Sequence, residues 1–337
     1  MKILFSTTNN PHFVTIAEYT ERALMKMGEV YFFDDRNFII PGRIRKRISF
    51  LHQWDLSRIN NELIRTIDKF KPDVFLEAGG HRIKVETVIR IKKKGIKTAL
   101  WTIDYPRGFK PIIESAPFYD FVFTGGSEAY EILKNCNIKN LYFLPFACDP
   151  DYAYPMEVNE EERNSYGSDI VFVGSYYPNR LEILEKISDF NLSVLGPGWN
   201  KVPSNSPLNK CIKKTYGVSC EEWRKIYSSS KIALAVHYQD GKIPCYQASP
   251  KVYEVLACKC FLLSDNQKDV VKLFKPGRHL DIFNNIDDLR RKLNYYLSKP
   301  EERKAIAEKG WKEVISKHTY LHRIKKMFDI IYNRGKD

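Results

Sequence analysis

Several features that would narrow the class of this protein are missing from its 337 residues. No apolar run approaches the roughly 20 residues that a transmembrane helix needs. The opening segment MKILFSTTNN has one lysine and too short an apolar core for a signal peptide, so we expect it to form a first strand. There is no zinc-finger, helix-turn-helix or RNP-type signature, no internal repeat and no low-complexity tract. These absences favour an ordinary globular protein.

Cysteine is sparse and follows no pattern. The seven cysteines are odd in number, and none shows the C-x-x-C spacing of a metal or redox motif. Free thiols of this kind fit a reducing compartment. We therefore expect a cytoplasmic protein, with the inner face of the membrane as a second location.

Positive charge, in contrast, is in excess. The chain has 54 lysines and arginines against 41 acidic residues, which gives a formal net charge of +13. Such an excess of positive charge is typical of proteins that bind nucleic acid, an anionic membrane surface, or an acidic or phosphorylated substrate. Because the basic residues are spread over the chain without a nucleic-acid-binding motif, nucleic acid ranks below the other two.

Short apolar runs alternate with helical patterns along the whole chain, which predicts parallel strands joined by crossover helices. The expected strands of the first half are 2–6, 30–34, 73–77, 98–103, 121–124 and 141–145, and its expected helices are 13–27, 55–70, 85–94 and 128–135. The expected strands of the second half are 169–174, 192–196, 231–237, 260–265 and 279–283. We predict an α/β fold of two Rossmann-like domains that face each other across a cleft.

The alternation breaks at PFACDPDYAYPMEVNEEER, a segment rich in proline and charge. We interpret residues 145–155 as a hinge. The predicted domains are an N-terminal one over 1–150 and a C-terminal one over 151–318, followed by a last helix over 319–337 that can return to the N-terminal domain.

Residues that follow strands are candidates for a site, because ligands of open α/β sheets bind beyond the carboxyl ends of the strands. His81 follows a strand of the first half, and Asp104 follows another within WTIDYP. Gly174 and Ser175 follow a strand of the second half, and Arg180 lies at the start of the next helix.

The segment SPKVYEVLACKCFLLSD, which begins at Ser249, is the most informative part of the chain. Ser249 is a good N-cap and Pro250 a good first helical residue. The free N–H groups and positive dipole end of such a helix suit a phosphate, and Lys251 adds a charge beside it. Glu254, one turn later, can accept hydrogen bonds from a sugar diol. The alternative is an ordinary capped surface helix.

Two other features are open to two interpretations each. His237, at the end of a strand, is either a satisfied core histidine or a ligand contact. The segment 41–54, PGRIRKRISFLHQW, either docks on an anionic membrane or acceptor, or is a solvated helix whose apolar side packs on its own domain. Its basic residues are Arg43, Arg45, Lys46 and Arg47, and its apolar ones are Ile44, Ile48, Phe50, Leu51 and Trp54.

These halves, the linker LPFACDPDYAYP and the SPKVYEVLACKC segment resemble GT-B glycosyltransferases, most of all the group of the spore-maturation protein CgeB. That group carries a basic residue shortly before a Glu, then Ala-Cys, LF-x-x-G, YYL-x-x-PEER and HTY-x-x-R. The matching positions here are Lys251, Glu254, Ala257-Cys258, Leu273 to Gly277, Tyr295 to Arg303, and His318 to Arg323. The likeness is specific over about residues 169–323.

The resemblance implies an enzyme that moves a sugar from a nucleotide-diphosphate donor, UDP-sugar first, to an unknown glycan, lipid-linked or protein acceptor. By the same resemblance, Ser249 and Lys251 would meet the diphosphate and Glu254 the ribose. Gly174, Ser175 and Arg180 would contribute to the diphosphate site, and the segment 231–237, with His237, would line the base pocket. A nucleotide-sugar epimerase or hydrolase, or a non-catalytic sugar-nucleotide-binding surface-assembly protein, are the alternatives.

For catalysis we expect Asp104 as the base, with His81 as the competing candidate. We expect no cofactor and no metal, because backbone amides, helix ends and basic side chains stabilise the leaving diphosphate in this fold. Many retaining relatives have a second Glu where Tyr246 stands, which leaves retention or inversion open. Many also have an arginine at position 251, whose bidentate phosphate contact Lys251 cannot make.

Overall fold

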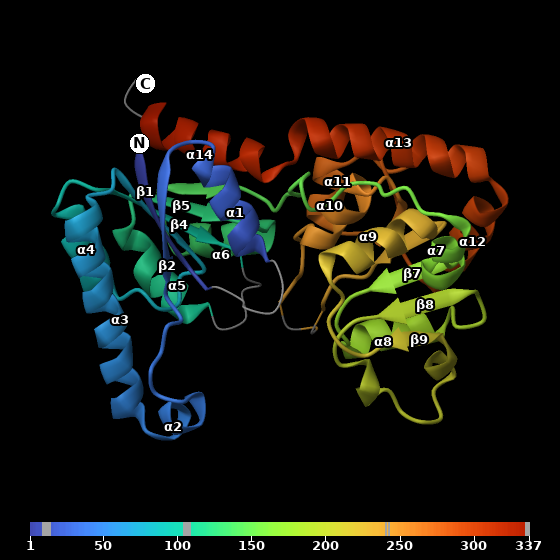
Figure 1. Ribbon diagram of the computed structural model, residues 1–337, viewed down its shortest axis with the longest axis horizontal. Coiled ribbons are helices and arrows are strands. Elements are labelled where there is room, and N and C mark those ends of the chain that lie inside the picture. The colour runs from blue at the N-terminus through green and yellow to red at the C-terminus, as the bar shows by residue number, and fades with distance from the viewer. Residues whose placement is uncertain (9–14, 104–108, 240, 242, 334–337) are drawn as a thin grey trace. The chain divides into compact units, whose positions relative to one another are not determined.

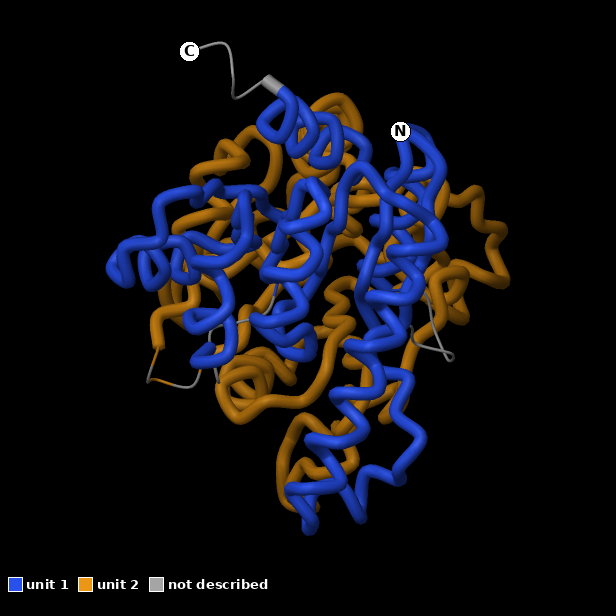
Figure 2. The backbone as a smooth tube through the Cα atoms, turned by 90° about the vertical axis from the view of Figure 1, so that its left-hand side faces the viewer, with its two compact units in different colours: residues 1–145, 320–337 blue, residues 146–319 orange. Residues whose placement is uncertain are grey.

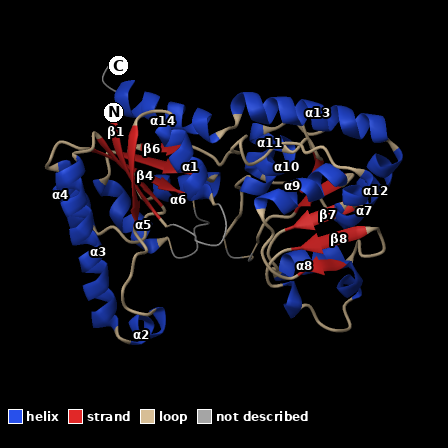
Figure 3. Ribbon diagram, viewed as in Figure 1, coloured by secondary structure: helices blue, strands red, loops and turns tan. Residues whose placement is uncertain are grey.

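The computed structural model describes residues 1–8, 15–103, 109–239, 241 and 243–333 (Figure 1). The chain forms two compact units. Unit 1 contains Met1–Pro145 and Tyr320–Asp337, and unit 2 contains Phe146–Thr319 (Figure 2). Each unit has one six-stranded sheet flanked by helices (Figure 3). The predicted α/β fold with two Rossmann-like halves is confirmed.

The sheet of unit 1 has the strand order β2-β1-β3-β4-β5-β6, and every neighbouring pair is parallel. Its strands are β1 (Lys2–Thr7), β2 (Glu29–Asp34), β3 (Val74–Ala78), β4 (Lys97–Thr102), β5 (Phe121–Thr124) and β6 (Leu141–Phe143). The central strands are buried on both faces, which is why they are continuous apolar runs in the sequence. All six strands predicted in this half are present, with shifts of a few residues at their ends.

The helices of unit 1 are α1 (Ile16–Met25), α2 (Gly42–Arg47), α3 (Ser49–Phe70), α4 (Val85–Lys92), α5 (Lys110–Ser115), α6 (Ser127–Asn135) and α14 (Tyr320–Asn333). A capping box between Thr15 and Glu18 starts α1. The helix α3 begins six residues before its predicted start at Asp55. The buried residues of α3 begin at Asp55. The periodic spacing of apolar residues in the sequence therefore predicted the buried part of the helix and missed its exposed first turns.

The last helix, α14, packs within unit 1. The Tyr320 ring lies 5.6 Å from that of Tyr19 and 6.3 Å from that of Trp101 between centroids. Arg323 Nε donates to the carbonyl of Pro145 at 2.9 Å. These contacts attach the end of the chain to the core of the first half.

The sheet of unit 2 has the order β12-β11-β10-β7-β8-β9, again with parallel neighbours. Its strands are β7 (Ile170–Val173), β8 (Leu192–Leu195), β9 (Ile212–Lys214), β10 (Ile232–Ala235), β11 (Phe261–Asp265) and β12 (Asp281–Phe283). Five of them match predicted strands. The sixth, β9, was missed because it is three residues long and two of them are lysines.

The helices of unit 2 are α7 (Glu160–Tyr166), α8 (Pro178–Glu185), α9 (Cys220–Ser229), α10 (Pro250–Ala257), α11 (Lys268–Leu273), α12 (Ile286–Ser298) and α13 (Pro300–Lys317). Phe172 and Trp199 meet edge to face in its core, with ring centroids 5.9 Å apart. Among the helices that the structure describes, none is long and apolar enough to cross a membrane.

Candidate functional site

The strand order of unit 2 reverses between β7 and β10. From β7 the chain adds β8 and β9 on one side of the sheet, and from β10 it adds β11 and β12 on the other side. Doubly wound sheets bind ligands in the crevice at such a reversal of strand order. Gly174 and Ser175 come directly after β7, and His237 comes two residues after β10. The reversal point therefore lies among residues that the sequence had singled out.

The turn after β7 is held by tight backbone packing. The Gly174 N–H donates to the Leu195 carbonyl at 2.8 Å, and the Gly174 carbonyl accepts the Trp199 indole N–H at 2.7 Å. Gly196 has φ +138°, and a Cβ there would lie 2.3 Å from the Gly174 oxygen. A glycine at 196 therefore permits the close approach that fixes this turn.

Arg180, in the first turn of α8, ties the turn after β7 to the end of β10. Its Nε donates to the Val236 carbonyl at 2.8 Å, and its Nη1 donates to the Ser175 carbonyl at 2.9 Å. The guanidinium also lies over the Tyr177 ring, 4.9 Å from the centroid. A guanidinium has five N–H donors, so three remain beyond these two bonds to described residues. Arg180 thus supplies a half-buried, fixed positive charge at the reversal point.

His237 connects the end of β10 to the start of α10. Its Nδ1 lies 2.5 Å from Asp265 Oδ1, and its Nε2 accepts the Ser249 backbone N–H at 3.1 Å. With Nε2 as the acceptor, Nδ1 is the ring nitrogen that faces Asp265 as a donor. Burial raises the pKa of Asp265, but its hydrogen bonds with His237 and Gln267 outweigh that effect, and the pKa of Asp265 lies below its usual value. Both ring nitrogens are therefore engaged inside the protein.

The start of α10 brings Lys251 and Glu254 to the same place. Pro250 occupies the first helical turn, and the Ser249 side chain makes no capping hydrogen bond there. The Val252 N–H donates to the Ser249 carbonyl at 3.0 Å, and the positive dipole end of the helix lies at this point. Burial lowers the pKa of Lys251 to about 8, with Glu254 opposing this and Arg180 adding to it. Burial also raises the pKa of Glu254, and Lys251 opposes that shift. Arg180 is bonded to Val236, and the next residue, His237, is bonded to Ser249 at the start of α10, so these contacts connect Arg180 to the helix that carries Lys251 and Glu254.

An open cavity of about 580 Å³ lies beyond the ends of β10 and β11. Lys268 reaches over the Tyr246 ring, with its ammonium 4.8 Å from the centroid, and Gln267 donates to Asp265 at 2.9 Å. The lining residues are Gln239, Gly241, Ile243, Pro244, Cys245, Tyr246, Asn266, Gln267 and Lys268. This hollow adjoins the reversal point, because Asp265 contacts both Gln267 and His237.

Sequence reasoning did not identify Asn266, Gln267 and Lys268 as candidates. They follow β11 directly, so the rule that selected Gly174 and Ser175 would have selected them as well.

The seven donor-site candidates all lie in unit 2, and hydrogen bonds or shared electrostatics bring them together: Gly174, Ser175, Arg180, His237, Ser249, Lys251 and Glu254. The two catalytic candidates belong to the other half of the chain. His81 is exposed and lies three residues beyond β3 in unit 1. Asp104 lies outside the residues that the structure describes.

Unit 1 holds a buried acidic cluster that the sequence analysis missed. Glu77, at the end of β3, accepts a hydrogen bond from the Tyr119 hydroxyl. Asp35 pairs with Arg82 at 2.9 Å. Burial, reinforced by the charge of Asp35, raises the pKa of Glu77 to about 8. The sequence signal for this cluster was Glu77 itself, a glutamate within the otherwise apolar strand VFLEA.

Comparisons with known proteins agree with this geometry. Residues 180–329 match the family described as glycosyl transferase-like, a region that contains Arg180 and the whole of α10. The chain is 22% identical to the spore protein CgeB of Bacillus subtilis over 272 residues, which cover 77% of this chain and 83% of that protein.

Solved structures show the same architecture. The sucrose-phosphate synthase of Thermosynechococcus elongatus superposes with a TM-score of 0.73 at 11% identity, over 99% of both chains. The Anabaena protein HepE in complex with UDP-glucose gives a TM-score of 0.70 at 8% identity, over 99% of this chain and 100% of that one. The fold is therefore GT-B, and the resemblance to GT-B glycosyltransferases and to the CgeB group is confirmed. The matches support a glycosyltransferase.

Proposed function

We propose that this protein transfers a sugar from a nucleotide-diphosphate donor, with UDP-sugar preferred, to a glycan, lipid-linked or protein acceptor. The observation that carries the proposal is the gathering of Arg180, Lys251 and Glu254 around the reversal point of the unit 2 sheet. The HepE complexes with UDP and UDP-glucose, which share the fold, support UDP as the nucleotide. The seven cysteines, all within the described ranges, form no disulfide, which supports a cytoplasmic location.

In this proposal the donor binds through complementary charge. Arg180, Lys251 and the start of α10 hold the diphosphate, with the Gly174–Ser175 turn beside them, and stabilise the negative charge that develops on it as the sugar leaves. Positive charge from the chain itself supports a metal-independent reaction. Glu254 accepts hydrogen bonds from the ribose hydroxyls. His237 acts by holding Ser249 in place.

We assign the general base to Asp104, with His81 as the competing candidate. Asp104 lies two residues beyond β4 and His81 three residues beyond β3, so both follow strands of the first half. General-base help is worth about a hundred- to ten-thousandfold in rate. Asp104→Asn should lose turnover by such a factor while donor affinity stays unchanged, and near-native turnover would refute the assignment. The same pair of assays on His81→Ala ranks the two residues.

The first experiment is a thermal-shift panel of UDP, GDP, dTDP and CDP. A ligand at a hundred times its Kd stabilises the folded state by about 2.7 kcal/mol, which is a readily measured shift in Tm. UDP should give the largest shift, and no shift with any nucleotide would refute the donor site. Release of the sugar without an acceptor would indicate a hydrolase. Conversion of the donor to its epimer would indicate an epimerase. Donor binding without turnover would indicate a non-catalytic sugar-nucleotide-binding protein.

A further inference from the structure

Residues 39–54 form a separate feature of unit 1, which we call the α2–α3 tip. It consists of the two residues before Pro41, the short helix α2 and the first turns of α3. Figures 1 and 3 show it at the end of α3 that points away from the sheet of unit 1. The tip contains four basic residues and no acidic one. The tip is therefore a concentrated patch of positive charge.

The same tip exposes large apolar side chains. The exposed fractions are 58% for Ile39, 43% for Ile44, 47% for Ile48, 75% for Phe50 and 49% for Trp54. These are five of the fifteen exposed large hydrophobic residues in the described part of the chain, within sixteen consecutive positions. Single exposed apolar residues are ordinary, but a cluster of them marks an interaction site. The alternative that this apolar side packs on its own unit does not hold for these residues.

The basic side chains of the tip divide into two groups. Arg45 is structural, because its Nε donates to the Ile40 carbonyl at 2.8 Å and its guanidinium lies 3.6 Å from the centre of the Phe38 ring. Arg43, Lys46 and Arg47 are exposed, and their side chains form no ion pair or hydrogen bond with any residue in the described ranges. Three positive charges are thus available to a partner.

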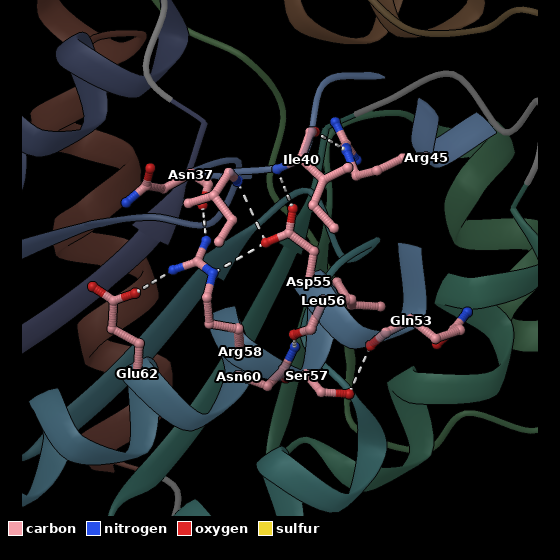
Figure 4. A network of polar contacts seen from close by, with 11 residues as sticks. Asn37, Ile40, Arg45, Gln53, Asp55, Leu56, Ser57, Arg58, Asn60 and Glu62 are labelled. Carbon is pink, nitrogen blue, oxygen red and sulfur yellow. Dashed lines mark hydrogen bonds and ion pairs between the residues drawn. The ribbon is translucent and has the colours of Figure 1, made fainter. Parts of the chain in front are cut away.

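A polar network holds the tip in one conformation (Figure 4). The carboxylate of Asp55, which is fully buried, accepts the backbone N–H of Ile40 at 2.9 Å and of Ile39 at 3.4 Å. Arg58 Nε donates to the same carboxylate at 3.0 Å, and its Nη2 donates to the Asn37 carbonyl. The segment that leads into α2 is therefore fastened to α3, and little ordering entropy is lost when the tip binds.

A hollow of about 390 Å³ lies between the two helices of the tip. It is lined by Gly42, Arg45, Lys46, Ser49 and His52. Its basic and hydroxyl side chains suit a phosphate group, and the exposed apolar residues of the tip suit the acyl chains that adjoin such a group in a lipid.

We propose that the α2–α3 tip docks this protein on an anionic membrane surface. Phe50, Trp54 and Ile48 enter the interface between headgroups and acyl chains, while Arg43, Lys46 and Arg47 contact the headgroup phosphates. A basic surface with interspersed aromatic and aliphatic residues and no acidic one is complementary to anionic lipid. The proposal goes beyond sugar transfer and does not depend on it.

The test is co-sedimentation of the full chain with vesicles of phosphatidylcholine alone and of an equal mixture with phosphatidylglycerol. Binding should require phosphatidylglycerol and should weaken with added salt, which screens the charges. The triple variant R43E/K46E/R47E should lower the partition coefficient by about a hundredfold or more, because each basic residue near an anionic surface contributes about fivefold to tenfold. Arg45 is left in place because it supports the fold of the tip.

The matched control is R65E/K69E/K93E, which makes the same change in net charge on exposed residues elsewhere in unit 1. It should lose far less binding. A second variant, F50S/W54S, should weaken binding to the mixed vesicles by about tenfold or more without any change in charge. Cooperative melting and an unchanged circular dichroism spectrum establish that each variant is folded.

Equal binding to both kinds of vesicle, no loss in R43E/K46E/R47E, or an equal loss in the control would overturn the proposal. Full displacement from vesicles by millimolar inorganic phosphate would also overturn it, in favour of a site for a soluble anion. Absence of any nucleotide-induced shift in the wild type would refute the donor site and leave the docking surface standing.

Discussion

His237 Nε2 accepts the backbone N–H of Ser249 at 3.1 Å. Ser249 is the N-cap of α10, so this bond sets the position of the helix start that carries Lys251 and Glu254. Asp265 holds the opposite nitrogen of the ring and thereby its orientation. His237 is a positioning residue, and its effect on a ligand passes through the residues that it holds in place.

His237→Leu tests this positioning. The change keeps apolar bulk but removes the acceptor of the Ser249 N–H and one of the donors to the Asp265 carboxylate. The free energy of unfolding should fall by about 1–3 kcal/mol, and UDP affinity should fall severalfold. Denaturant unfolding and calorimetry measure the two effects. His279→Leu, at another buried histidine of unit 2, should destabilise the protein while UDP affinity stays unchanged. Equal UDP affinity in wild type and His237→Leu would contradict the assigned role.

Lys251 should make donor binding depend on pH. Its pKa is lowered to about 8 by burial, so the ammonium is charged below about pH 8 and loses its proton as the pH rises through that value. UDP affinity should be constant below this pH and fall above it, by up to about tenfold for each further pH unit. Calorimetry across this range gives the profile.

Lys251→Arg is the matched variant, because a guanidinium stays charged throughout that range. Its profile should be flat above pH 8. If the wild-type and Lys251→Arg profiles run parallel, Lys251 does not contact the diphosphate.

Glu254→Gln keeps the shape of the side chain and removes its charge. A hydrogen bond to a charged acceptor contributes about 1.5–3 kcal/mol, so UDP affinity should fall by at least about tenfold. The fall should be smaller for dTDP, whose deoxyribose has one hydroxyl fewer. Glu182→Gln, at an exposed position of α8, should have no effect. Unchanged affinity for UDP in Glu254→Gln would remove this residue from the ribose contact.

Glu77 should make stability depend on pH. Its pKa is about 8 in the folded protein, against 4.5 for an ordinary glutamate. Between these two values the folded state holds the proton more tightly than the unfolded state, so stability falls as the pH rises through this window. The loss amounts to a few kcal/mol, because one pKa unit corresponds to about 1.36 kcal/mol.

Glu77→Gln removes the titrating group and should flatten this decline. The variant should therefore be more stable than the wild type at pH 8, while the two converge below about pH 4.5. Thermal melts over this pH range measure the difference. A variant that is less stable than the wild type at pH 8 would show that the carboxylate itself is required by the fold.

The sequence was most informative where burial leaves a periodic trace. Strands such as β3 and β7 are covered on both faces, so they appear as short apolar runs that indicate a parallel sheet. The chain direction of parallel strands then places Gly174, Ser175 and His237 near one edge of the sheet. This reasoning predicted the fold and gathered the donor-site candidates.

Contacts between distant residues left no such trace. Ser249 follows His237 by twelve residues without regular spacing, and Tyr119 lies 42 residues from Glu77. Their pairing depends on how loops leave the sheet, and no local pattern encodes that. The same limit applied to the α2–α3 tip, where the amphipathic pattern was compatible with both a buried and an exposed apolar side.

The amino-acid sequence by itself determined the alternation of strands and helices, the positive charge and the helix start at Ser249, because each depends on neighbouring residues. The tertiary structure alone decided the strand order of each sheet, the hydrogen-bond partners of His237, the raised pKa of Glu77 and the exposure of Phe50 and Trp54. Each of these depends on which distant segments exclude water from a group, and burial of that kind is a property of the packed chain.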